Sequence, residues 1–142
     1  MKIHRDSAEL LAEIGRVLTA SRPSFHSSPL QEVIELLSRG LHATWVGIYL
    51  AAGTNNQRLV GAGGEPHPGE MARPETKSKI LVSMTLAGHE FGILDVESDR
   101  ENAFGPGSRV LLENVANLLA RFLAGPGRYL ARKARAMATA KA

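Results

Sequence analysis

The clearest pattern in the sequence is a period-two alternation within residues 78–98. Apolar residues occupy the even positions of 80–86, and mostly polar residues lie between them, which is typical of a strand with one fully apolar face. Ala-Gly at 87–88 predicts a tight turn, and residues 91–97 predict the returning strand. The pattern therefore predicts an antiparallel hairpin.

Two acidic residues of the returning strand share one face of this hairpin. Asp95 and Glu97 are two residues apart, and such side chains point the same way from a strand. Gly92, Leu94 and Val96 lie on the opposite face. Because two carboxylates on one sheet face are unusual, this face is a candidate for function.

Helical periodicity predicts two helices before the first strand. The first begins with Asp-Ser-Ala-Glu at 6–9, where Asp6 caps the helix and Glu9 reaches back, and it ends at Arg-Pro, 22–23. The second begins with Ser28 as cap and Pro29 at the first helical position. Gly40 suits the C′ position just beyond its end.

The other elements follow from the same reasoning. Residues 44–50 predict a strand, residues 58–62 a short strand, and the proline-rich and glycine-rich residues 63–77 a loop. The longest helix opens at Phe-Gly-Pro, 104–106, and is broken by Gly-Pro-Gly, 125–127.

This order of elements predicts an α+β fold: an antiparallel sheet with helices packed on one face and a pocket on the other. The opposite face mixes aromatic, hydroxyl and charged side chains, as the wall of a small-molecule pocket does. Its expected members are Trp45, Tyr49, Leu81, Ser83, Thr85, Ile93, Asp95 and Glu97.

Composition excludes several classes of protein. A chain of 142 residues with 44% hydrophobic content can bury one core. It contains no apolar run that could span a membrane and no signal peptide, so we expect a cytoplasmic protein without a membrane partner. It has no cysteine, which excludes disulfides and thiol chemistry. The five histidines show no metal-ligand spacing, and we expect neither a metal nor a cofactor.

The net charge of +3 is unevenly distributed. The residues after Gly127 carry five cations and no acid, which leaves the remainder mildly acidic. We therefore expect a single domain at 1–127 and a basic C-terminal tail at 128–142. Because the tail has no aromatic residue beyond Tyr129, we expect it to aid solubility rather than to bind nucleic acid.

The chain resembles a GAF domain, most clearly in motifs that match the C-terminal half of that family. The resemblance rests on Phe-Gly-Ile-Leu-Asp-Val-Glu-Ser at 91–98, Asn-Ala-Phe at 102–104 and the helix Leu-Leu-Glu-Asn-Val-Ala-Asn-Leu-Leu-Ala at 111–120. It covers roughly residues 30–123. It implies a sheet with helices on one face, a ligand pocket on the other, and dimerisation through the first and last helices.

Within that family, the chain is similar to the free methionine-R-sulfoxide reductases. By this resemblance, Trp45, Asp95 and Glu97 match positions that line the substrate site. The chain lacks that branch's catalytic cysteines, and without a thiolate there is no nucleophile for the sulfoxide. Where that branch has the pair Ser-Glu, this chain has Ser78-Lys79. In the branch, the glutamate contacts an amino group, which a lysine at the same position would repel. The resemblance therefore implies the fold and the pocket position, not the activity.

The candidate ligand-binding residues allow two interpretations. Asp95 and Glu97 either contact a ligand or are neutralised by an ion pair with Lys79, and Trp45 and Tyr49 either stack on a planar ligand or form part of the core. The full set of candidates is Trp45, Tyr49, Lys79, Ser83, Asp95 and Glu97. No residue is expected to be catalytic.

We therefore expect a non-catalytic GAF-like sensor that binds an unidentified small molecule and forms a homodimer through its terminal helices. The alternative is a structural or dimerisation module with a vestigial pocket. An enzyme of the methionine sulfoxide reductase type is the third hypothesis, which the missing cysteines disfavour.

Overall fold

The computed structural model describes residues 7–20, 29–41, 43–51, 57–64 and 77–132. The elements in these ranges are α1 (Ser7–Ala20), α2 (Pro29–Leu41), β1 (Trp45–Ala51), β2 (Gln57–Gly64), β3 (Ser78–Leu86), β4 (His89–Ser98) and α3 (Pro106–Ala124). The predicted α+β order is therefore confirmed. The caps expected at Asp6 and Ser28 and most of the predicted 63–77 loop lie outside the described residues.

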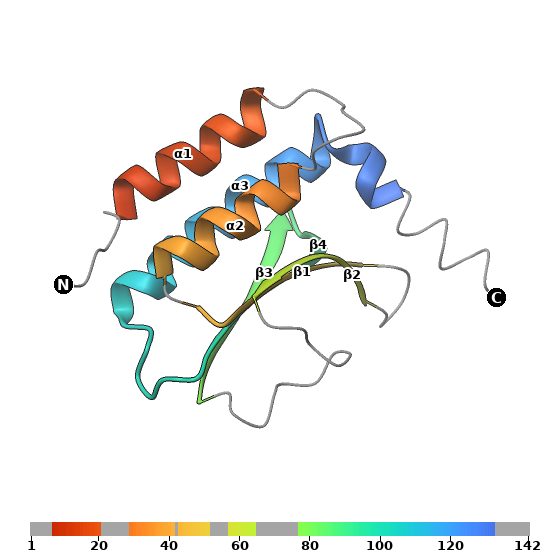
Figure 1. Ribbon diagram of the computed structural model, residues 1–142. Coiled ribbons are helices and arrows are strands. Elements are labelled where there is room, and N and C mark those ends of the chain that lie inside the picture. Colours follow the sequence, from red (N-terminus) through yellow and green to blue (C-terminus); the bar gives the residue numbers. More distant parts are fainter. Residues whose placement is uncertain (1–6, 21–28, 42, 52–56, 65–76, 133–142) are drawn as a thin grey trace.

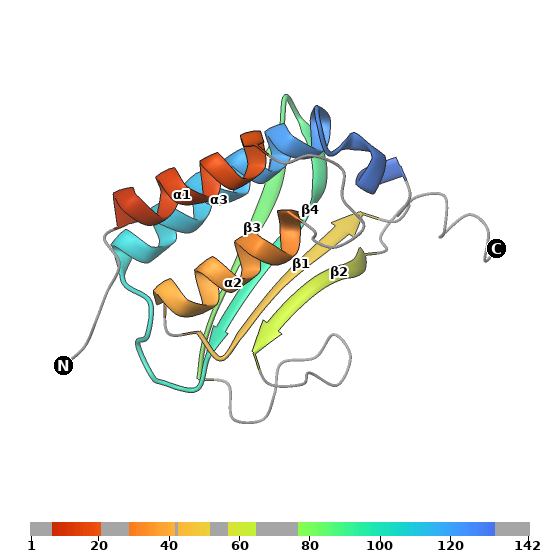
Figure 2. The ribbon, with the colours of Figure 1, turned by 45° about the horizontal axis from the view of Figure 1, so that its top comes forward.

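The four strands form one antiparallel sheet in the order β2-β1-β4-β3. The three helices lie on the same side of the sheet, as Figures 1 and 2 show. Helix α2 packs over β1 and β2, α3 packs over β3 and β4, and α1 packs on α2 and α3. The other face of the sheet is therefore left for the candidate site.

The hairpin predicted at 78–98 is present, and its strands are slightly longer than the pattern indicated. Its turn is at Ala87 and Gly88, whose φ angles are 52° and 81°. Two successive residues with positive φ give the tight connection whose twist matches antiparallel strands. The apolar face of β3 contributes Ile80, Val82 and Met84 to the core.

Gly40 does not follow α2, as the sequence predicted, but lies inside its last turn. A Cβ atom built on Gly40 would lie only 2.7 Å from Cδ2 of Leu10 in α1. The glycine therefore leaves room for Leu10 where α1 packs closely against α2, and it does not mark the end of the helix.

Helix α3 begins and ends where the sequence predicted, with Gly105 as N-cap and Pro106 in the first turn. The break at 125–127 is held by the amide of Gly127, which donates to the carbonyl of Phe122 at 2.7 Å. Beyond the break, Ala131 is buried and Leu130 packs against the core. The division between a domain and a tail at residue 127 stays a prediction.

None of the helices in the described ranges is long and apolar enough to cross a membrane.

Candidate functional site

Strand register brings the candidate residues together on the face opposite the helices. Side chains of three strands form rows across this face, because residues opposite each other in a sheet point the same way. The rows are Trp45–Glu97–Lys79, Gly47–Asp95–Leu81 and Tyr49–Ile93–Ser83. The two acids thus lie in adjacent rows at the middle strand, β4.

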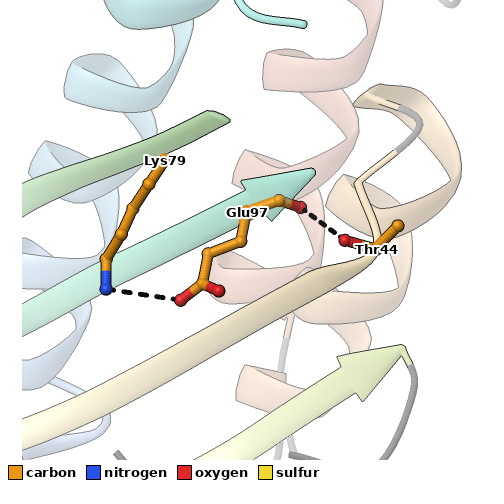
Figure 3. A network of polar contacts seen from close by, with 3 residues as sticks. All are labelled: Thr44, Lys79 and Glu97. Atoms are coloured by element: carbon orange, nitrogen blue, oxygen red, sulfur yellow. Dashed lines mark hydrogen bonds and ion pairs between the residues drawn. The ribbon is translucent and has the colours of Figure 1, made fainter. Parts of the chain in front are cut away.

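Glu97 is held through both its side chain and its backbone. Its side chain is fully buried, and its Oε2 lies 3.4 Å from Nζ of Lys79 on β3 (Figure 3). Its backbone carbonyl accepts hydrogen bonds from the amide of Thr44 at 2.9 Å and from the Thr44 hydroxyl at 3.2 Å. The predicted ion pair with Lys79 is therefore present, and it balances the charge of a buried carboxylate.

Asp95 has a different environment from Glu97. Only 2% of its surface is exposed, and burial, followed by its hydrogen bond and charge repulsion with Glu97, raises the pKa of its carboxyl from 3.8 to about 8. Lys79 acts in the opposite direction and only partly offsets these effects. Asp95 is therefore mainly protonated at neutral pH, whereas an exposed aspartate would be ionised.

One oxygen of Asp95 is left without a partner in the part of the chain that the structure describes. Oδ1 is buried and makes no hydrogen bond to a described residue. A buried acceptor without a partner typically costs about 1–3 kcal/mol. Oδ1 is therefore an acceptor on this face that could take a further hydrogen bond.

Trp45 and Tyr49 are both buried, on β1. Gly47 lies between them, directly opposite Asp95, and contributes no side chain to the face. Two aromatic side chains therefore flank the position across from the acid. This arrangement suits a planar ligand, although burial alone is also what a core role would give, so both interpretations of the aromatics remain.

Ser83 is not brought to the acid pair. It is exposed, and its hydroxyl donates to Oε1 of Glu90 at 2.8 Å. It lies in the row of Ile93, one row from Asp95 and two from Glu97. Its assignment as a ligand contact stays a prediction, and the structure places it at the margin of the site.

Sequence reasoning did not single out Gly47 or Thr44 as parts of the site. The alternation along β1 could have indicated Gly47, since it shares a face with Trp45 and Tyr49. Thr44 acts through its hydrogen bonds to the backbone of Glu97. Only the pairing of β1 with β4 reveals that contact.

A groove lies on the helical side of the molecule, away from the candidate face. It is an open groove of about 530 Å³ between the start of α1 and the first half of α3. Its lining is largely apolar: Ser7, Ala8, Leu11, Pro106, Gly107, Val110, Leu111 and Asn114. Val110 is 57% exposed, so this apolar surface faces solvent in the single chain.

Within the described ranges, no cluster of three or more histidine, aspartate or glutamate side chains could hold a metal ion. The Asp95–Glu97 pair with Lys79 beside it forms a polar patch on the sheet.

Solved structures of known proteins share this fold. Free methionine-R-sulfoxide reductase from Neisseria meningitidis, in complex with its substrate, matches with a TM-score of 0.72 and 18% identity, over 97% of each chain. The enzyme from Staphylococcus aureus, also with substrate, matches with a TM-score of 0.67 and 17% identity, over 87% of this chain and 99% of that chain. The GAF domain of a phosphoenolpyruvate-protein phosphotransferase from Coxiella burnetii matches with a TM-score of 0.69 and 15% identity, over 88% and 96%.

The chain has a GAF-like fold. The resemblance inferred from the sequence is confirmed at this level, since the structural neighbours include GAF domains and free methionine-R-sulfoxide reductases. No protein-family model matches the sequence, and no curated protein matches it. Structural matches with a sequence identity below about 25% show a shared fold only. The activity of this chain therefore has to be argued from its own site residues.

Proposed function

We propose that this GAF-like chain is a non-catalytic sensor domain that binds a small molecule on the sheet face of Trp45, Tyr49, Asp95 and Glu97. The observation that carries the proposal is the buried Oδ1 of Asp95, which has no hydrogen-bond partner within the described residues. A buried polar atom normally has a partner. A bound ligand that donates a hydrogen bond would supply it.

The fold supports this location for the ligand. The neighbours from Neisseria meningitidis and Staphylococcus aureus are reductases solved with their substrate, and the resemblance matches Trp45, Asp95 and Glu97 to their substrate positions. The helices cover only the other face of the sheet (Figure 2). The two buried aromatic side chains add flat apolar surface of the kind found in small-molecule pockets.

The proposal is for binding rather than catalysis, because the chain contains no cysteine. Reduction of a sulfoxide by the chemistry of that branch needs a thiolate nucleophile and a disulfide to close the cycle. In addition, Lys79 occupies the position of the branch's glutamate and forms an ion pair with Glu97. Turnover of free methionine sulfoxide by the purified protein would contradict the non-catalytic proposal.

Native mass spectrometry of gently purified protein tests the binding proposal. We expect extra mass that corresponds to a co-purified small molecule, lost on denaturation. The matched variant is Asp95→Ala, which removes the proposed contact, with exposed Asp99→Ala as the control. Bound mass that persists in Asp95→Ala would place the ligand elsewhere on the protein.

The second candidate function is a dimerisation module, and the groove between α1 and α3 favours it. The groove is apolar and open, and Val110 stands exposed at its edge. Apolar surface of this kind on the terminal helices suits the face of a second copy of the chain. The same mass spectrum reports the oligomeric state, and a dimer without bound mass would favour this function over the sensor.

A further inference from the structure

We infer that the site selects an electrically neutral ligand that donates a hydrogen bond from an N–H or O–H group to Asp95, and that it rejects cations. Carboxamides and urea-like groups belong to this class. The inference rests on the proposed function and adds the chemistry of the ligand to it.

The first argument is the balance of charge around Glu97. Its carboxylate is buried and is matched by Lys79, whose Nζ lies 3.4 Å from Oε2. The Lys79 side chain is about one-third exposed and that of Glu97 is fully buried, so solvent reaches the lysine of the pair and not the carboxylate. A ligand cation that approached Glu97 would meet Lys79 first and would be repelled. Two acids on one face therefore do not make this a cation site.

The second argument is the state of Asp95. Burial and the neighbouring Glu97 raise the pKa of its carboxyl to about 8, so at neutral pH the group adds no net charge. The carboxyl makes a hydrogen bond with Glu97, and its Oδ1 is buried without a hydrogen-bond partner among the described residues. The protonated carboxyl can donate to Glu97, and Oδ1 is left as an acceptor that faces no described partner.

The surroundings of Asp95 contain no other charge among the described residues. The titratable groups that face it are Glu97 from β4, Lys79 from β3 and Tyr49 from β1. Its direct neighbours across the sheet are Gly47 and the apolar Leu81, which is 52% exposed. The local charges therefore sum to zero, and a neutral donor binds without disturbing them.

A cation would bind only if Asp95 first lost its proton. Its affinity would then increase about tenfold for each unit by which the pH rises, until the pH reaches the pKa of Asp95. A neutral donor has no such requirement, and its affinity is expected to stay level over the same range. An anion would be disfavoured by Glu97. The three classes of ligand are therefore separated by charge and by pH dependence.

Benzamide and benzamidine provide a matched pair of probes, because both are planar and carry N–H donors, while only benzamidine is cationic near neutral pH. We would follow the backbone amides of Gly47, Asp95 and Glu97 and the indole of Trp45 by NMR at about pH 6, where Asp95 is protonated. We expect benzamide to shift these signals and to bind at least about tenfold more tightly than benzamidine, a difference of about 1.4 kcal/mol.

Lys79→Gln provides the internal check, since it removes the cation and leaves Glu97 uncompensated. This variant should shift the preference toward benzamidine, whereas Lys77→Gln, at an exposed lysine just before β3, should not. Tighter binding of benzamidine to the unaltered protein would overturn the inference and leave the proposed function standing. If neither probe shifts these signals, both the inference and the proposed binding face are contradicted.

Discussion

Lys79 and Glu97 lie directly opposite each other on β3 and β4, and their side chains meet at 3.4 Å (Figure 3). By the sequence resemblance to the reductase branch, Lys79 corresponds to the glutamate of that branch at the start of the strand. One lysine therefore changes the charge of the candidate site from acidic to neutral without changing the strand register. Such a change alters which ligands the same fold accepts.

Reversal of this charge should change ligand preference. Lys79→Glu is expected to raise affinity for amino-acid-like ligands by about tenfold, because it replaces a cation that repels an ammonium group with a carboxylate. Isothermal titration calorimetry with free methionine sulfoxide measures the effect. Lys77→Glu makes the same change of charge just outside the strand and serves as the control. Unchanged affinity in Lys79→Glu would show that Lys79 does not face the ligand.

Asp95 should make the stability of the protein dependent on pH. Between about pH 4 and pH 8, the carboxyl is protonated in the folded chain and ionised in the unfolded chain, so the folded state binds one more proton. The free energy of unfolding should therefore fall as pH rises through this window, by up to about 1.4 kcal/mol per unit, and no further above the folded pKa.

Comparison with Asp95→Asn isolates this contribution, since asparagine is similar in shape and does not titrate. Urea unfolding at about pH 5 and about pH 8 should show that the variant loses less stability than the unaltered protein as pH rises. Asp99→Asn, at an exposed acid nearby, should behave like the unaltered protein. Equal pH dependence in Asp95→Asn and the unaltered protein would mean that Asp95 is ionised in the fold.

The groove between α1 and α3 should be sensitive to charge if it is the surface of a dimer. Val110→Asp is expected to convert a dimer to a monomer in light scattering coupled to size-exclusion chromatography, because a carboxylate would be buried in an apolar interface. Leu81→Asp places the same group at a similarly exposed position on the sheet and should leave the dimer intact. A monomeric unaltered protein would remove the dimerisation hypothesis.

The end of α3 should tolerate no additional methyl group at Gly127. A Cβ atom there would lie 2.2 Å from Cε2 of Phe122, whose ring is buried. Gly127→Ala is therefore expected to destabilise the protein by about 1–3 kcal/mol through overpacking. Gly107→Ala, where a Cβ atom would meet nothing within 4 Å, should be neutral or slightly stabilising. Thermal unfolding should give a lower melting temperature for Gly127→Ala than for Gly107→Ala. Equal melting temperatures would contradict the close packing of Gly127 against Phe122.

Local patterns determined most of the elements. The alternation at 78–86 identified β3 and its buried face, because side chains of a strand alternate by geometry alone. Pro106 and the 125–127 break marked the ends of α3, because proline and glycine act on the backbone directly. The same local reasoning placed Gly40 beyond α2, and it was wrong there because the close approach of Leu10 from another helix is not a local property.

The site was determined only in part by the sequence. Alternation alone placed Asp95 and Glu97 on one face and Trp45 and Tyr49 on a face of another strand. The pairing of β3 with β4 confirmed the ion pair with Lys79 for Glu97, which the sequence had offered as one of two interpretations, and it showed that Ser83 lies apart. The pairing of β1 with β4 decided that Asp95 faces Gly47. The protonation of Asp95 and the groove beside Val110 depend on burial and on helix packing. Burial and helix packing bring together segments that are far apart in the chain, so only the tertiary structure could decide these two properties.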